Sequence, residues 1–239
     1  MVFHQLQASD RHEHTATQEN MQAISYSYTS AISKVSRAKA ANYVQVQTDE
    51  QIEGTFTIDP ELCVPSWMLP SLQPGRGTTR THLFLESKEK SVDGLIHLVH
   101  SRTTLEDSPV PTRTLLEVTA YRGVTLDIFP RSPYSCNHLR FRLKVVVEWG
   151  NIVLRIPPDF HGPIRYTTAA AQARFSLGVR EKMLVLTQKS KTGSCFIGEW
   201  AQPEGEDAVW TGDEIEVTST SDYSSHKISF TLSGETDDE

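Results

Sequence analysis

The chain has 239 residues, a formal net charge of −7 and 38% hydrophobic residues. It is long enough and apolar enough to form a core, which excludes a wholly disordered protein. Clustered Lys and Arg drive phosphate binding, so the negative charge argues against a nucleic-acid partner. No apolar run approaches the roughly 20 residues of a membrane-spanning helix, and we predict no membrane span.

Cysteine usage and the N-terminal residues bear on the compartment. Cys63, Cys136 and Cys195 lie far apart, and their odd number leaves at least one thiol free. Residues 1–5 lack the positive region and apolar core of a secretory signal, and the chain contains no Asn-x-Ser/Thr sequon. These features predict a soluble cytoplasmic protein.

The N-terminal segment differs in composition from the rest. Residues 1–42 are rich in Gln, Ser, Thr, Ala and His, and we interpret them as a flexible arm. Its part 18–41 lacks Pro and Gly, so a helix is the regular element expected there. A β-repeat domain is expected over 43–233, followed by an acidic tail over 234–239.

Order is expected from Tyr43, because residues 44–46 and 56–58 show the period-two alternation of strands. Prolines between 60 and 70 then stop regular pairing, and this segment should run as an extended strap. Its apolar anchors are expected to be Trp67, Met68 and Leu69.

One pattern then recurs: an alternating apolar strand, a short turn with a glycine, and a second alternating strand. The clearest copies are 115–128 and 142–156, and looser copies run over 83–99 and 215–232. Shorter strand pairs are expected within 164–197. Because one such unit cannot bury its own apolar face, we predict an all-β, solenoid-like stack of the single-stranded β-helix type.

Aligning the two clearest copies on their glycines gives a register. Glu117 falls beside Lys144 and, after allowance for one extra residue, Asp127 falls beside Arg155. Each pair would contribute about 0.2–1 kcal/mol, enough to disfavour a register slip. The alternative is that each copy is an antiparallel hairpin and that the hairpins pack as a β-sandwich, which periodicity alone does not exclude.

Several short segments carry a family resemblance: 52–60, 83–88, 158–164, 195–198 and 210–214. In this order, over about 43–233, they resemble an uncharacterised fungal family known as domain of unknown function 7330. That family is similar to adhesin-type β-repeat proteins, in which Ser/Thr-x-x-Gly turns join the strands of successive rungs, so the resemblance implies stacking. The chain departs from the pattern at 87–94 and 169–171, and the resemblance implies no activity.

Three tryptophans are the candidate binding residues: Trp149, Trp200 and Trp210. Exposed aromatic faces favour sugars or peptide side chains, whereas the competing role is to plug the open ends of the stack. The leading hypothesis is a non-catalytic β-repeat scaffold or binding module whose partner is a protein or a glycan.

The alternative function is a carbohydrate-active enzyme of the β-helix type. The register puts His97, Asp127 and Arg155 in consecutive units, where a carboxylate and a cation could manage an acidic sugar and its proton. The competing interpretation is that solvated charges neutralise one another. The enzyme requires the three side chains to point into one groove.

Histidines give no converging set. His4, His12 and His14 lie in the arm, and His97 and His100, three apart on a strand, face opposite sides. Zinc sites need ligands that converge on one point, so we predict no metal and no cofactor.

Two further segments contain reactive residue types. Residues 159–161 lie between prolines and are interpreted as a corner in which Phe160 packs inward while its polar neighbours face water. Cys195, preceded by Ser194, has no adjacent base, which argues against a nucleophile.

Overall fold

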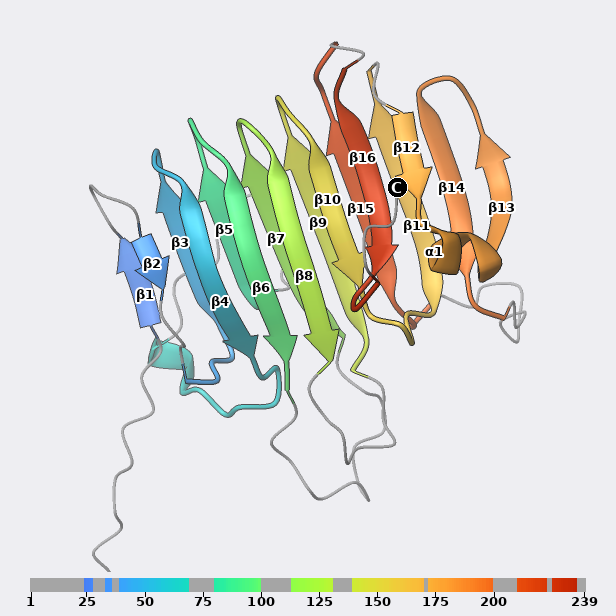
Figure 1. The fold of residues 1–239 in the computed structure, drawn as a ribbon. Coiled ribbons are helices and arrows are strands. Elements are labelled where there is room, and N and C mark those ends of the chain that lie inside the picture. The colour runs from blue at the N-terminus through green and yellow to red at the C-terminus, as the bar shows by residue number, and fades with distance from the viewer. Residues whose placement is uncertain are drawn as a thin grey trace, which may run out of the picture.

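The structure is a computed structural model that describes residues 24–27, 33–35, 39–68, 80–99, 113–130, 139–169, 172–199, 210–222 and 225–235. In these ranges the chain is mostly β, and two sheets face each other as the layers of one stack (Figure 1). The all-β prediction is confirmed. None of the helices in these ranges is long and apolar enough to cross a membrane.

The two sheets differ in length. In the described residues sheet A has nine strands, in the order β1 (Ile24–Ser27), β3 (Val44–Thr48), β5 (Leu83–Ser87), β7 (Thr114–Ala120), β9 (Phe141–Val147), β15 (Glu214–Ser219), β11 (Gly162–Thr168), β14 (Thr192–Ile197) and β13 (Met183–Gln188). Sheet B has seven, in the order β12 (Gln172–Phe175), β16 (Lys227–Leu232), β10 (Ile152–Ile156), β8 (Val124–Pro130), β6 (Val92–Leu98), β4 (Ile52–Ile58) and β2 (Ser33–Val35). A short 3-10 helix, η1 (Ser66–Met68), and the helix α1 (Leu177–Glu181) complete the described elements.

Apart from β13 and β14, consecutive strands of one unit lie in different sheets. β7 belongs to sheet A and β8 to sheet B, and the same holds for β3/β4, β5/β6, β9/β10, β11/β12 and β15/β16. In each sheet the strands of neighbouring units pair in parallel. Each unit is therefore a β-arch across the two layers. The hairpin alternative is wrong for these units, whereas β13 and β14 do form an antiparallel pair.

The predicted register is confirmed. Glu117 pairs with Lys144 across β7 and β9, and Asp127 pairs with Arg155 across β8 and β10. The inward-facing apolar residues fall side by side as well, as Leu116 does with Leu143. A one-residue slip would turn these apolar side chains to the outside, so the shared interior fixes the register.

The core lies between the sheets and runs through all the arches. Strand residues alternate between buried and partly exposed, as the burial of every second residue in β7 illustrates. Among the fully buried side chains are Phe56, Leu85, Ile96, Leu126, Val145, Leu154, Ile215 and Phe230. Burying a side chain of this size contributes about 1.5–3 kcal/mol relative to exposure, so the interior supplies most of the stabilisation.

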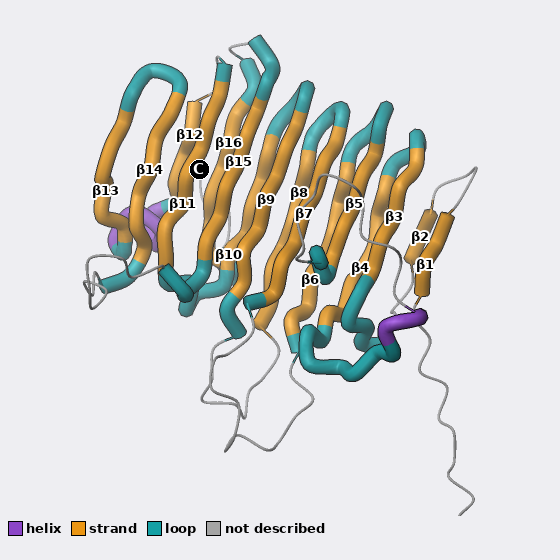
Figure 2. Tube along the Cα trace, turned by 180° about the vertical axis from the view of Figure 1, so that it is seen from behind, coloured by secondary structure: helices purple, strands orange, loops and turns teal. Residues whose placement is uncertain are grey.

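The last arch of the chain lies inside the stack rather than at its end. β15 is inserted between β9 and β11, and β16 between β10 and β12, with parallel pairing on both sides. Figures 1 and 2 show this arch from opposite sides of the stack. The repeat expected at 215–232 is thus a unit of the stack, but its place in space does not follow its place in sequence.

At this end sheet A extends two strands beyond sheet B. A strand was expected over 173–177, whereas β12 ends at Phe175 and α1 begins at Leu177. Val179 of this helix is buried in the core. The carboxylate of Glu235 accepts hydrogen bonds from Gly178 N at 2.8 Å and Leu232 N at 2.9 Å, and another from the Ser176 hydroxyl. The bonds from Ser176 and the two backbone groups lower the pKa of Glu235.

Two other expectations are wrong. In the segment 18–41, where a helix was expected, the described residues form β1 and β2, which pair with β3 and β4. Trp67, expected to anchor the strap, is 82% exposed. Residues 1–23 of the expected arm, Leu69 of the strap and residues 236–239 of the expected tail lie outside the described residues.

His82 joins three neighbouring arches through its backbone and its ring. Its carbonyl accepts from Val44 N at 2.8 Å, and its amide donates to Leu115 O at 2.8 Å. Its Nδ1 accepts from Leu115 N at 3.0 Å, a bond that a protonated Nδ1 cannot make. Burial lowers the pKa of His82 from its ordinary value of 6.5.

We therefore expect acid to destabilise the fold through His82. Because the folded-state pKa lies below the unfolded value of 6.5, the unfolded chain takes up the proton first. The contribution of neutral His82 to the free energy of unfolding is fully present above pH 6.5. It is lost as the pH falls below that value, by at most about 1.4 kcal/mol per pH unit. Urea unfolding of wild type and His82→Asn, whose amide oxygen accepts without titrating, should show a shallower pH dependence for the variant. Equal slopes would contradict this role.

Candidate functional site

The turns of the arches line up along one edge of the stack, the upper edge in Figure 1. We call the turns 49–51, 88–91, 121–123 and 148–151 the turn ridge. Hydrogen bonds join each turn to the next: Lys88 N donates to Thr48 O at 3.0 Å, Tyr121 N to Ser87 O at 3.1 Å, and Glu148 N to Ala120 O at 3.1 Å. The ridge is therefore a continuation of the parallel ladder of sheet A.

Two aromatic side chains are exposed on neighbouring turns of this ridge. Tyr121 is 37% exposed and Trp149 is 41% exposed, and Trp149 N donates to Tyr121 O at 2.6 Å. The ring of His226 lies 6.1 Å from that of Trp149 in an edge-on arrangement, and Gly150 N donates to His226 Nδ1 at 3.2 Å. The backbone that carries both aromatic rings is thus fixed by the hydrogen bond between the two turns and by the hydrogen bond to His226.

The other two candidate tryptophans differ from Trp149. Trp210 is partly buried, its indole Nε1 donates to Asp213 O at 2.8 Å, and its ring lies edge-on to His161 at 5.5 Å and Phe196 at 5.2 Å. This packing gives Trp210 a structural role at the start of β15, which lies inside the stack and not at one of its open ends. Trp200 lies outside the described residues.

The three residues of the alternative enzyme site lie on the outer face of sheet B. Asp127 and Arg155 are lateral neighbours, whereas His97 pairs with Phe129, two residues further along, with ring centroids 5.8 Å apart. The Asp127 carboxylate accepts a hydrogen bond from the Ser233 hydroxyl at 2.8 Å. The register therefore places Asp127 beside Arg155, whereas His97 lies diagonally from Asp127 on the neighbouring strand.

The remaining reactive residues are built into the fold. Phe160 packs inward against Phe141, as predicted, but His161 is not turned to water: its Nε2 lies 2.7 Å from Glu199 O and its ring packs on Phe196. Burial raises the pKa of Cys195 to about 12, so its thiol stays protonated at neutral pH.

Metal ligands do not gather in the described part of the chain, where no group of three His, Cys, Asp or Glu residues is placed to hold an ion. The histidines at 4, 12, 14 and 100 lie outside it.

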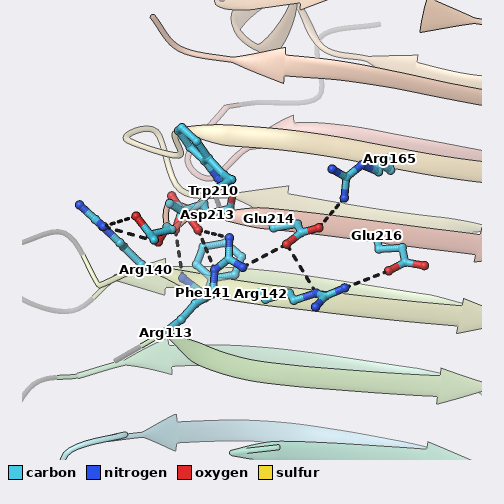
Figure 3. A network of polar contacts seen from close by, with 11 residues as sticks. Arg113, Arg140, Phe141, Arg142, Arg165, Trp210, Asp213, Glu214 and Glu216 are labelled. Atoms are coloured by element: carbon cyan, nitrogen blue, oxygen red, sulfur yellow. Dashed lines mark hydrogen bonds and ion pairs between the residues drawn. The ribbon is translucent and has the colours of Figure 1, made fainter. Parts of the chain in front are cut away.

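A network of ionic contacts covers the outer face of sheet A around β15 (Figure 3). Glu214 contacts three guanidinium groups, those of Arg165 at 2.6 Å, Arg113 at 3.1 Å and Arg142 at 3.6 Å. Its side chain is only 10% exposed, so these contacts replace its hydration. Arg142 also contacts Glu216 at 3.6 Å.

A second carboxylate anchors the start of β15. Asp213 is fully buried and accepts from Phe141 N and from His161 N, each at 3.1 Å. Arg113 donates to Gly212 O, and Arg140 to the Thr211 hydroxyl at 3.1 Å. Residues at the starts of β7, β9 and β11 thereby hold the segment that leads into β15.

Sequence reasoning missed Tyr121, His226 and this network. The alignment contained a signal for Tyr121, because it occupies the turn that corresponds to the turn of Trp149. The alternation of Glu214 and Glu216 with apolar residues was a signal for an acidic outer face on β15, but nothing in the chain order indicated its basic neighbours.

Fold and site together define a two-layer stack of parallel β-arches with an aromatic-bearing turn ridge. The chain belongs to the family described as domain of unknown function (DUF7330), whose family model matches residues 42–232. No curated protein and no solved structure matches the chain.

The ridge requires a glycine at position 150. Gly150 has a φ of +97°, and a Cβ there would lie 1.7 Å from the carbonyl oxygen of Arg122 in the neighbouring turn. Gly234 has a similar φ of +90° but no atom within 4 Å of such a Cβ. An alanine at either position would therefore meet the same backbone penalty, whereas only an alanine at position 150 would also meet a steric overlap.

We expect Gly150→Ala to destabilise the fold more than Gly234→Ala. The left-handed backbone costs each variant about 1–2 kcal/mol. The overlap with a backbone carbonyl should add about 1–3 kcal/mol to Gly150→Ala alone. Urea denaturation measures both, and equal losses would show that the neighbouring turns are not in contact.

Proposed function

We propose that the protein is a non-catalytic β-repeat scaffold, a solenoid-like stack of the single-stranded β-helix type, that binds a protein or glycan partner through the turn ridge. The observation that carries the proposal is the exposure of Tyr121 and Trp149 on adjacent, hydrogen-bonded turns. Aromatic rings with one apolar face and a polar edge are favoured in recognition surfaces.

Rigidity of the ridge supports this role. A partner that contacts Tyr121 and Trp149 need not order the backbone beneath them, because the turns already hydrogen-bond to one another. Less conformational entropy is then lost on binding. The charged neighbours Arg122 and Glu148 give the same surface both signs of charge for polar contacts at its rim.

We propose a cytoplasmic location, which agrees with the free thiol of the buried Cys195. The net charge of −7 disfavours nucleic acid as the partner. The enzyme hypothesis is the less supported one, because the Asp127 carboxylate is engaged by Ser233 and His97 is offset from it.

A comparison of two aromatic variants tests the proposal. The double substitution Tyr121→Ala and Trp149→Ala removes both rings of the ridge, whereas Trp67→Ala removes an even more exposed tryptophan away from it. Each protein is applied to a glycan array and to cross-linking capture from the native cell lysate. We expect a ligand that wild type and Trp67→Ala bind alike and that the ridge variant binds at least about tenfold more weakly, or about 1.4 kcal/mol.

Two outcomes would contradict the proposal. One is that wild type retains no glycan and no protein above background. The other is that every ligand found binds the ridge variant and wild type with equal affinity.

A further inference from the structure

The C-terminal arch occupies a slot whose charge is opposite to its own. On the outer face of sheet A, β15 presents Glu214 and Glu216. β9 on one side presents Arg142 and Lys144, and β11 on the other side presents Arg165. The register places Glu216 between Lys144 and Arg165, so the charge alternates across three adjacent strands.

The order of the chain would produce a different arrangement. If β11 added directly to β9, these same registers would bring Arg165 beside Lys144. Like charges directly opposite each other on neighbouring strands are destabilising. An acidic strand between the two basic ones removes this repulsion, which gives the slot a preference for β15 over a direct contact between β9 and β11.

The contacts that hold the arch in the slot are non-covalent and lie on the arch itself. At its start are the Trp210 ring, which packs on His161 and Phe196, the buried Asp213 carboxylate and the carbonyl of Gly212 that Arg113 binds. At its end is Glu235, which binds α1. Residues 210–235 therefore form one docking unit, and nothing in these contacts requires the slot to belong to the same molecule.

The connection to this unit is long compared with the gap that it crosses. β14 ends at Ile197 and β15 begins at Glu214, and the two strands flank β11, so they lie two strand spacings apart, or about 10 Å. The 12 residues between Ile197 and Trp210, where the docking unit begins, have a maximum reach of about 40 Å. This reach exceeds the gap, as exchange between molecules requires.

We propose that the slot between β9 and β11 accepts the matching C-terminal arch of a second copy of this chain, so that two copies whose own arch and slot do not match exchange arches and form a domain-swapped dimer. The contacts are the same within and between molecules, so the tether alone favours the monomer. A tether of this length corresponds to an effective concentration on the order of millimolar. The wild-type chain is therefore monomeric at micromolar concentration, and the swapped dimer is populated when the arch no longer matches its own slot.

Two full-length variants with reversed charges test this. The arch variant carries Glu214→Arg and Glu216→Lys, and the slot variant carries Arg113→Gln, Arg142→Glu, Lys144→Glu and Arg165→Glu. Alone, each should stay monomeric and lose hydrogen-exchange protection in β15 and β16 while β5 to β8 remain protected. Mixed at micromolar concentration, they should form a 1:1 dimer by light scattering and regain protection in β15 and β16.

A third variant with both sets of substitutions in one chain is the control, since its arch and slot match again. It should be a protected monomer like wild type. If it is protected while the mixture stays monomeric, the exchange proposal is wrong. If it is unprotected, or if the arch variant alone keeps full protection, charge does not select the arch and the proposal also fails.

Discussion

The interior shared by successive arches is the constraint on which the rest of the structure depends. Apolar side chains such as Leu116, Leu143 and Ile215 lie side by side along sheet A, and the residues of sheet B face them across the core. An arch alone would leave these side chains at the edge of the core open to water, so each unit is stable only beside another. Parallel register, the line of turns and the exposure of Tyr121 and Trp149 all follow from that stacking.

Burial of apolar side chains does not distinguish one arch from another as a neighbour. The charges on the outer face of sheet A do distinguish them. Glu214 and Glu216 on β15 lie between basic strands, and Asp213 fixes the entry to that strand. Pairing of the little-exposed Glu214 contributes little net stability, but a like charge beside it would be strongly penalised. Here they favour an arch order that differs from the order in the chain.

The sequence was sufficient for the strand repeat and its register, because period two and the turn glycines are local signals, and Glu117 with Lys144 confirmed the alignment. The place of the last arch was not predictable, since lateral neighbours in a stack need not be neighbours in the chain. Trp67 shows another limit, because an apolar residue between prolines can lie inside or outside. For the candidate site, the sequence identified Trp149. Its neighbour Tyr121 could be recognised only when the two turns were known to lie side by side.

The inserted position of β15 between β9 and β11 can be tested by disulfide trapping between outward-facing residues. In a cysteine-free background, Val146→Cys with Thr218→Cys joins register partners on β9 and β15, about 4.8 Å apart and within disulfide range. Val146→Cys with Thr167→Cys would join β9 to β11, which β15 separates. We expect rapid oxidation of the first pair and none of the second; the reverse result would contradict the account.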